Sequence, residues 1–547
     1  MTIAPGVMAT QGFQKLRFLI IDDFDNFRVS MRQILRSLSV DKVETASTGN
    51  VAIHLCTYEH FDVVLCDYNL GAGKNGQHIL EELRHRKLLK RSSLFLMVTA
   101  ETSKEMVMGA REYQPDAYLA KPVNRAMLES RLTSLIAQRS ALLPINKELD
   151  LENIPEAISL CVKAIPIHPR YKSWLMKTLA DLYIRVGDYA HARKIYHSVL
   201  AQRDISWAQL GKCKVLLAEQ AYDEAKMELQ DLITKHPDFM EAYDVLADTL
   251  TRDGKPSEAQ RILEKATELS PNVLLRHKTL AELATSNQNI ETAAAAWRRT
   301  VKLGAHSIHD GADHYLSLGR TLSEVSEGDL SDTGRSQADE AILALKKMTN
   351  RFPDIADIET QSLLIQARIH KGQNREKDAY ECLAQAEASV EQDMMTADLG
   401  LELGKTLFHL DRPERAESLL NKLAQRFEAD PVTVHKIENL LDEPVGFKEK
   451  LHARSLNRQG IRAFEAGSLD KAVEAFRKAL TIVPSHTALN LNLVQVLMKQ
   501  MSEGGAPPDT IKQCQQCLFA LANLPTQHQQ YRRYLELRKK LEAISHA

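Results

Sequence analysis

The sequence has few aromatic residues and no excess of either charge. Aromatic side chains make up 6% of the 547 residues, and 70 basic residues against 72 acidic ones leave a formal net charge of -2. Without a net positive charge the chain has no general attraction to phosphate backbones or anionic membranes, so we do not expect it to bind nucleic acid. A hydrophobic content of 44% excludes a disordered polymer.

Long apolar runs are also missing, and cysteines are sparse. The N-terminus lacks the charged start and apolar stretch of a secretory signal, and nowhere do about 18 apolar residues run together. We therefore expect a cytoplasmic protein that does not contact the membrane. Seven thinly spread cysteines exclude a disulfide framework. We interpret Cys514 and Cys517, an isolated CxxC, as helical residues because no second pair supplies zinc ligands.

The chain is longer than one hydrophobic core usually organises, so we expect it to divide. From Arg17 to Gln138, short apolar runs alternate with amphipathic segments, which predicts helices covering a parallel sheet. The expected strands are Phe18–Ile21, Val43–Ala46, Val63–Cys66, Leu94–Val98 and Ala117–Leu119. Several of these runs are apolar on both faces, as central parallel strands require. The pattern predicts a doubly wound α/β domain.

After about Pro144 only helical periodicity remains, and it repeats. Ala225, Ala259 and Ala293 lie 34 residues apart, the interval of the tetratricopeptide repeat. Residues matching that repeat are Tyr243, Ala247, Leu250, Gly254, Ala259, Leu263, Ala266 and Pro271, then Leu456, Gly460, Gly467, Ala472, Phe476, Ala479 and Pro484, and also Met176, Leu179, Ala180, Tyr183, Gly187, Ala192 and Tyr196. Small residues let paired helices approach, and stacking buries their apolar faces.

Weaker copies of the repeat suggest about eight to ten in total. They are centred on Gly319, Ala367 and Gly404. The stretch Glu324–Arg335, rich in Ser, Gly and Asp, is predicted to be a surface loop, and Asp442–Phe447 is predicted to interrupt the helices. The expected organisation is an α/β domain at 15–139, a linker at 140–150, helical repeats at 151–440, a break at 441–452 and further repeats and flanking helices at 453–547.

Polar residues follow four of the predicted strands. Asp22 and Asp23 follow the first strand, Asp67 ends the third, Thr99 ends the fourth, and Lys121 and Pro122 follow the fifth. Ligands bind at the carboxyl ends of strands in open α/β sheets, so the fold would bring these residues together. Clustered carboxylates favour a hard cation such as Mg²⁺. A carboxylate can accept a phosphoryl group, which a lysine and a threonine hydroxyl would stabilise.

Residues 17–138 resemble the receiver domain of two-component response regulators, particularly the stand-alone chemotaxis members. The resemblance is carried by IIDDF at 20–24, VVLCDYN at 63–69, VTAE at 98–101 and YLAKP at 118–122. It implies a flavodoxin-like fold with a five-stranded parallel sheet, followed here by an all-α tetratricopeptide solenoid.

The resemblance also implies how the acidic residues work. Asp67 would accept a phosphoryl group from a histidine kinase or a phosphotransfer protein. Asp23, Asp67 and the backbone carbonyl of Asn69 would contact Mg²⁺, and Asp22 would assist through water. The domain would catalyse only its own phosphorylation and dephosphorylation, so we do not expect an enzyme in the usual sense.

Further roles implied by the resemblance concern the last two strands. Lys121 would pair with the phosphoryl group, Thr99 would move toward it, and Tyr118 would turn inward and alter the face formed by the fourth helix, fifth strand and fifth helix. The bond between Lys121 and Pro122 would be cis. The chain departs from the family at 70–76, where a glycine-containing loop is one residue longer than in the chemotaxis members.

No effector motif other than the helical array is evident. We expect phosphorylation at Asp67 to change how the domain docks on the array or a partner, which would gate binding of an unknown protein in the array's groove. Two alternatives stay open. In the first, the chain is a phosphorelay intermediate or phosphate sink, and the array only localises it. In the second, the chain is a phosphorylation-regulated RNA or nucleic-acid binder, as the basic clusters Arg84–Arg91 and Arg532–Lys540 suggest.

Overall fold

The computed structural model describes residues 13–100, 112–287, 289–390 and 395–441, and then 456–457, 459–464, 466–482, 486–505, 507–522 and 530–545. The chain forms two compact units, residues 1–318 and residues 319–547. Three predicted features lie outside the described residues: the helix after the fourth strand, the interruption at 442–447, and Pro484.

The N-terminal domain is built on one parallel sheet, as predicted. Its strands are β1 (Arg17–Ile21), β2 (Lys42–Ala46), β3 (Val63–Asp67), β4 (Leu94–Thr99) and β5 (Ala117–Ala120). The sheet has five strands in the order β2-β1-β3-β4-β5, and each neighbouring pair is parallel. The order reverses between β1 and β3, which is where ligands bind in doubly wound folds. All five expected strands are confirmed within one residue at each end.

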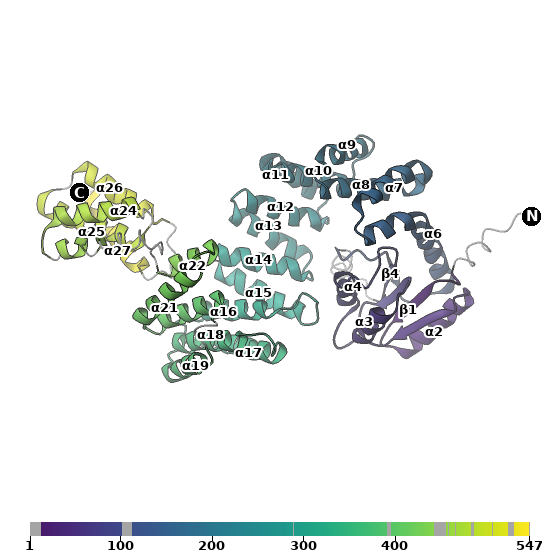
Figure 1. Ribbon diagram of the computed structural model, residues 1–547, viewed down its shortest axis with the longest axis horizontal. Coiled ribbons are helices and arrows are strands. Elements are labelled where there is room, and N and C mark those ends of the chain that lie inside the picture. The colour runs from purple at the N-terminus through teal and green to yellow at the C-terminus, as the bar shows by residue number, and fades with distance from the viewer. Residues whose placement is uncertain are drawn as a thin grey trace, which may run out of the picture. The chain divides into compact units, whose positions relative to one another are not determined.

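Helices cover both faces of this sheet (Figure 1). α2 (Asp25–Ser37) and α6 (Arg125–Asp150) pack on one face, and α3 (Gly49–Tyr58) and α4 (Gly76–His85) pack on the other. Side chains of β1 alternate between the two cores, because successive residues of a strand point to opposite faces. Phe18 and Ile20 join the cluster with α2 and α6, and Leu19 and Ile21 join the cluster with α3 and α4.

Past Asp150 the described elements are all helices, which confirms the predicted all-α region. In the first unit they are α7 (Ile154–Ile167), a 3₁₀ turn (Pro169–Tyr171), α8 (Lys172–Arg185), α9 (Tyr189–Leu200), α10 (Ser206–Ala218), α11 (Tyr222–Lys235), α12 (Met240–Arg252), α13 (Pro256–Leu269), α14 (Leu274–Ser286) and α15 (Ile290–Gly304). α16 (Ala312–Val325) crosses the boundary between the units. In the second unit they are α17 (Asp332–Arg351), α18 (Ile358–Gly372), α19 (Glu376–Ala388), α20 (Ala397–His409), α21 (Pro413–Arg426), α22 (Pro431–Leu441), α24 (Leu469–Ile482), α25 (Thr487–Gly504), α26 (Pro508–Phe519) and α27 (Tyr531–Ser545).

Small residues allow the helices of the array to pack closely. A Cβ atom on Gly211 would lie 2.2 Å from the ring of Tyr196, and one on Gly404 would lie 2.8 Å from the side chain of Leu420. Neither contact is possible for a larger residue without moving a buried neighbour. The packing therefore depends on glycine at these helix crossings.

Two features of the array differ from the sequence-based expectation. The predicted loop Glu324–Arg335 is wrong at both ends, since α16 continues to Val325 and α17 already begins at Asp332. The reason is that the Ser331 side chain caps α17 by accepting a hydrogen bond from the Gly334 backbone N–H at 3.3 Å. Residues 140–150, expected to be a linker, are the helical C-terminal part of α6.

Cys514 and Cys517 lie on α26, as the helical interpretation predicted. Both thiols are buried in an apolar cluster with α24, α25 and α27. Burial raises the pKa of Cys514 to about 12 and that of Cys517 to about 11, so both are protonated near neutral pH. Among the described helices none combines the length and the apolar character needed to cross a membrane.

Candidate functional site

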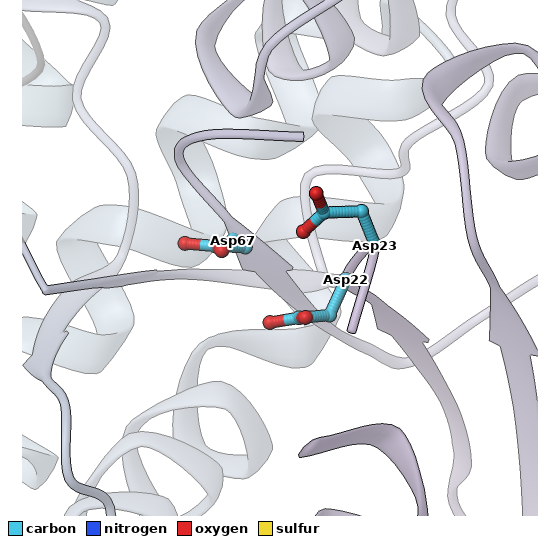
Figure 2. Close-up of side chains that lie close together, drawn as sticks. All are labelled: Asp22, Asp23 and Asp67. Carbon is cyan, nitrogen blue, oxygen red and sulfur yellow. The ribbon is translucent and has the colours of Figure 1, made fainter. Parts of the chain in front are cut away.

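Three carboxylates meet at the carboxyl edge of the sheet (Figure 2). Asp22 comes directly after β1, and Asp67 is the last residue of β3, the strand paired with β1. A carboxylate oxygen from each of Asp22, Asp23 and Asp67 lies within 4.8 Å of the others. Asp22 and Asp67 are buried, whereas Asp23 is exposed. The strand register thus places side chains together that are 45 residues apart in the chain.

A single ammonium group bridges the two buried carboxylates. Lys121 Nζ lies 2.7 Å from Asp22 Oδ2 and 2.8 Å from Asp67 Oδ2. Its backbone N–H donates to the Thr99 carbonyl at 2.8 Å, which holds the segment after β5 against the end of β4. The ammonium also lies 4.3 Å from the centre of the Phe27 ring, a cation–π contact. Lys121 therefore contacts the segment that follows β1 and three further elements, β3, β4 and α2.

The electrostatics of the site reflect its excess of negative charge. Burial raises the pKa of Asp67 and the nearby Asp22 adds to this, while Lys121 and the backbone N–H of Asn69 act in the opposite direction and only partly offset it. Burial by itself would lower the pKa of Lys121, but hydrogen bonds to Asp22 and Asp67 outweigh it and raise the pKa above its usual value. The raised pKa of Asp67 is therefore mainly an effect of burial, whereas the raised pKa of Lys121 comes from its pairing with two carboxylates.

This donor set fits a magnesium ion. Three carboxylates supply oxygen ligands from two loops, and one lysine does not balance their charge. A hard divalent cation prefers such oxygen ligands and lowers the repulsion between them. The acidic cluster predicted from the sequence is thus present, and its residues could hold Mg²⁺.

The other predicted site residues lie around this cluster. Asn69 is in the loop between β3 and α4, where its side chain accepts a hydrogen bond from the Gly71 N–H at 3.3 Å. Gly71 has φ +70°, a left-handed conformation that glycine adopts without strain. Thr99 ends β4, and Tyr118 lies in β5 against the apolar cluster of α3 and α4. The peptide bond between Lys121 and Pro122 is cis.

Sequence reasoning missed two residues of the site, one that contacts Asp22 and one that contacts Lys121. The Arg28 guanidinium donates to the Asp22 backbone carbonyl at 2.5 Å, and the Phe27 ring lies against the ammonium of Lys121. Both lie in the first turn of α2, immediately after the acidic pair. The signal that could have found them is position, because the first turn of a helix that follows a strand faces the same edge of the sheet.

The basic cluster at 84–91 makes contacts within the protein. Arg84 donates to the backbone carbonyls of Tyr113 and Gln114, and Lys87 Nζ lies 2.8 Å from Glu152 Oε1. These hydrogen bonds and ion pairs are the ordinary uses of surface arginine and lysine. Part of this basic cluster therefore takes part in contacts within the protein.

Comparisons with known proteins find similarities for two parts of the chain. A model of the response regulator receiver domain matches residues 18–133, and a tetratricopeptide repeat model matches residues 216–283. Chemotaxis protein CheY-3 of Vibrio cholerae is 30% identical over 122 residues, which are 22% of this chain and 92% of that protein. The chain belongs to the response-regulator family.

Two solved structures give further similarities to this response regulator. Chemotaxis protein CheY4 of Vibrio cholerae is 27% identical to the matched part of this chain. The match covers 22% of this chain and 98% of the CheY4 chain, with a TM-score of 0.21. The MamA protein is 17% identical to the matched part of this chain. The match covers 34% of this chain and 90% of the MamA chain, with a TM-score of 0.26. By the two family models, the response regulator has an N-terminal receiver domain of the kind used in two-component signalling, and a tetratricopeptide repeat lies in its helical region.

Proposed function

We propose that this response regulator accepts a phosphoryl group on Asp67 from a histidine kinase or a phosphotransfer protein, and that its phosphorylation state gates protein binding by the helical array. The observation that carries the proposal is the bridge formed by Lys121 between buried Asp22 and buried Asp67. A structural ion pair needs one carboxylate, whereas this lysine has two, and a third lies within 4.8 Å. That excess of acid is what a phosphoryl-accepting magnesium site requires.

The proposed chemistry is the transfer of a phosphoryl group from a histidine nitrogen of the donor to a carboxylate oxygen of Asp67. A carboxylate oxygen of Asp67 attacks the phosphorus of a donor phosphohistidine, an O–P bond forms, and the N–P bond breaks with its electron pair going to the imidazole, which takes a proton from solvent. Lys121 and the Thr99 hydroxyl then face the phosphoryl oxygens. Asp23, Asp67 and the Asn69 carbonyl would hold Mg²⁺, with Asp22 acting through water, and the ion would neutralise charge on the transferring group.

In the proposed function, the chain has the domain organisation predicted from its sequence. Residues 15–139 act as the receiver, and 151–440 together with 453–547 form the array. Residues 140–150 are the C-terminal part of α6, which ends at Asp150, and α7 begins at Ile154.

Removal of magnesium tests the acidic site directly. We expect chelation with EDTA to reduce labelling of Asp67 by acetyl phosphate about 100-fold, because the ion contributes several kcal/mol to stabilising the transferred charge. Mass spectrometry of hydroxylamine-labile phosphate measures the effect, and excess Mg²⁺ should restore labelling. Full labelling in EDTA would contradict the assignment of Asp22, Asp23 and Asp67 as a metal site.

Quantitative partner capture tests the gating. Wild type and Asp67→Asn would each be immobilised with and without acetyl phosphate, and bound proteins would be identified and titrated. We expect at least one partner whose affinity changes about tenfold on treatment of wild type and does not change for Asp67→Asn, which corresponds to about 1.4 kcal/mol of coupling. The control is Asp41→Asn, which changes an exposed aspartate just before β2. Identical partners and affinities in every state would refute the gating and favour a phosphate sink.

A further inference from the structure

A buried arginine of the array binds a carboxylate of the receiver. Arg276 on α14 donates to both oxygens of Glu112, with Nη1–Oε1 at 3.2 Å and Nη2–Oε2 at 2.6 Å. Two further donors, on Nε and Nη2, go to Oδ1 and Oδ2 of Asp244 on α12, each at 2.7 Å. The Arg276 side chain is 1% exposed. A bidentate pair between a buried guanidinium and a carboxylate is among the stronger polar contacts in proteins.

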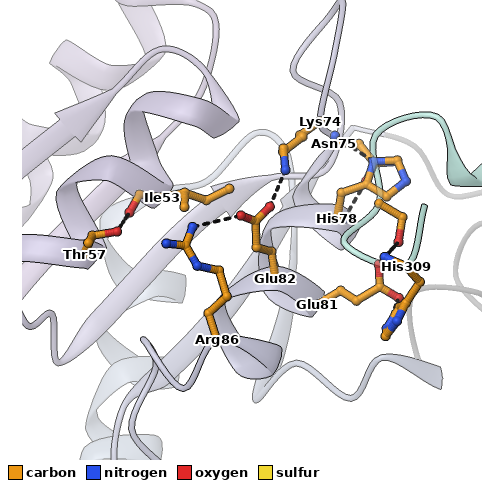
Figure 3. Close-up of polar contacts among 10 residues, drawn as sticks. Ile53, Thr57, Lys74, Asn75, His78, Glu81, Glu82, Arg86 and His309 are labelled. Atoms are coloured by element: carbon orange, nitrogen blue, oxygen red, sulfur yellow. Dashed lines mark hydrogen bonds and ion pairs between the residues drawn. The ribbon is translucent and has the colours of Figure 1, made fainter. Parts of the chain in front are cut away.

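A second receiver carboxylate contacts the segment that follows α15. Glu81 on α4 accepts a hydrogen bond from the Ser307 hydroxyl at 2.6 Å, and its other oxygen lies 3.5 Å from His309 Nε2 (Figure 3). Ser307 is itself held in place, since its oxygen accepts the His309 backbone N–H at 3.1 Å. Glu81 and Glu112 therefore hold the receiver at two separate points of the array.

His78, one turn before Glu81 on α4, lies between these elements. Its Nδ1 accepts the backbone N–H of Asn75 at 3.3 Å, which leaves the proton of the neutral ring on Nε2. Burial, followed by the neighbouring His306, lowers the pKa of His78 to about 4, although a backbone hydrogen bond with Leu303 acts in the opposite direction. An uncharged ring packs against this part of the array without the cost of burying a charge.

The same surface is continuous with the phosphorylation site. A cavity of about 420 Å³ is lined on the receiver side by Tyr68, Asn69, Gly71, Gly73 and Asn75, and on the array side by Asn272, Arg299, Lys302 and Ser307. These receiver residues are the loop that follows Asp67. The Gly76 N–H donates to the Tyr68 carbonyl at 2.8 Å, and a Cβ on Gly76 would lie 2.4 Å from the Asp67 carbonyl. α4 therefore begins in direct contact with the backbone of Asp67.

Arg276 has a third role, as part of the wall of a groove in the array. The groove, about 610 Å³, is lined by α12, α13 and α14 with an apolar floor that includes Ala247, Leu263 and Leu275. Because Glu112 pairs with Arg276, the receiver lies against that end of the groove.

We infer that Glu81 and Glu112 hold the receiver against α14 and the segment after α15, at the Arg276 end of the groove. These contacts of Glu81 and Glu112 are called the latch below. In this inference, phosphorylation at Asp67 changes the latch through the loop between β3 and α4. The inference rests on the proposed function for its trigger. The latch itself is carried by geometry: two carboxylates of one domain meet a buried arginine and a held serine of the other. The 420 Å³ cavity between them adjoins the acceptor loop.

Hydrogen–deuterium exchange of the full chain tests the latch. In Glu81→Gln/Glu112→Gln we expect amides at 76–85, 270–276 and 305–311 to exchange at least about threefold faster than in wild type, because both charged anchors are lost. Ser307→Ala removes one anchor from the array side without changing charge and should accelerate the same segments. The matched control is Glu129→Gln/Glu474→Gln, which neutralises one carboxylate in each of two i,i+4 ion pairs outside these segments and should leave their exchange unchanged.

The trigger is tested in the same samples by adding Mg²⁺ and acetyl phosphate. Exchange in these three segments should change about threefold or more in wild type and stay constant in Asp67→Asn. If these segments exchanged at the wild-type rate in both Glu81→Gln/Glu112→Gln and Ser307→Ala, the latch would be overturned, whatever the labelling of Asp67 shows. Labelled wild type with unchanged exchange would overturn control of the latch, and failure of Asp67 to label would instead contradict the proposed function.

Discussion

Replacing Asp67 by asparagine is expected to reduce phosphoryl labelling by about 1,000-fold or more, because a neutral amide oxygen is a poor nucleophile toward phosphorus. The change keeps the shape of the side chain, and Lys121 retains its 2.7 Å contact with Asp22, so the fold of the receiver should persist. Incorporation of hydroxylamine-labile phosphate from acetyl phosphate, followed over time, measures the loss.

The control for this variant is Asp41→Asn. Asp41 is an exposed aspartate just before β2, and it is not among the clustered carboxylates. Labelling of Asp41→Asn should equal that of wild type. If Asp67→Asn were labelled at the wild-type rate, another residue would be the acceptor and the proposed function would fail.

Replacing Glu402 by alanine is expected to destabilise the second unit by about 3–5 kcal/mol, the usual cost of breaking a buried ion pair by removing one partner. Glu402 lies on α20, 4% exposed, and pairs with Arg320 of α16 at 2.8 Å and with Arg368 of α18. Without the carboxylate, the nine-tenths-buried guanidinium of Arg368 loses its neutralising partner. Urea unfolding of the full chain, followed by the helical circular dichroism signal, should show an earlier transition.

The matched control is Glu417→Ala, an exposed glutamate on α21, which should change the transition by no more than about 0.5 kcal/mol. The effect of Glu402→Ala should also depend on pH. Burial raises the pKa of Glu402, but Arg368 and Arg320 outweigh it, so the folded-state pKa is below the ordinary value. The stabilisation is therefore fully present above about pH 4.3, the unfolded value, and is lost as the pH falls through the folded pKa. Equal unfolding transitions for both variants near pH 7 would contradict this role.

The receiver could be predicted in detail because its pattern is local and its geometry is regular. Each strand is a short apolar run, and parallel strands present their carboxyl ends at one edge. Placing Asp67 at the end of one run and Lys121 just after another was enough to predict that they meet. The start of α17 was not predicted from composition, because the Ser, Gly and Asp content of 324–335 favours a loop, whereas Ser331 caps the helix by accepting from the Gly334 N–H.

The sequence by itself determined the two kinds of architecture, the acidic edge of the sheet and the residues that gather there, because strand and helix periodicities and strand ends are properties of neighbouring residues. Only the tertiary structure decided which charged side chains are buried and paired. Glu112 and Arg276 are 164 residues apart, and Arg368 and Glu402 join successive helix pairs. Such contacts depend on how helices stack and on which face each side chain covers, and in a chain with so many charged residues no local pattern distinguishes these pairs from solvent-exposed ones.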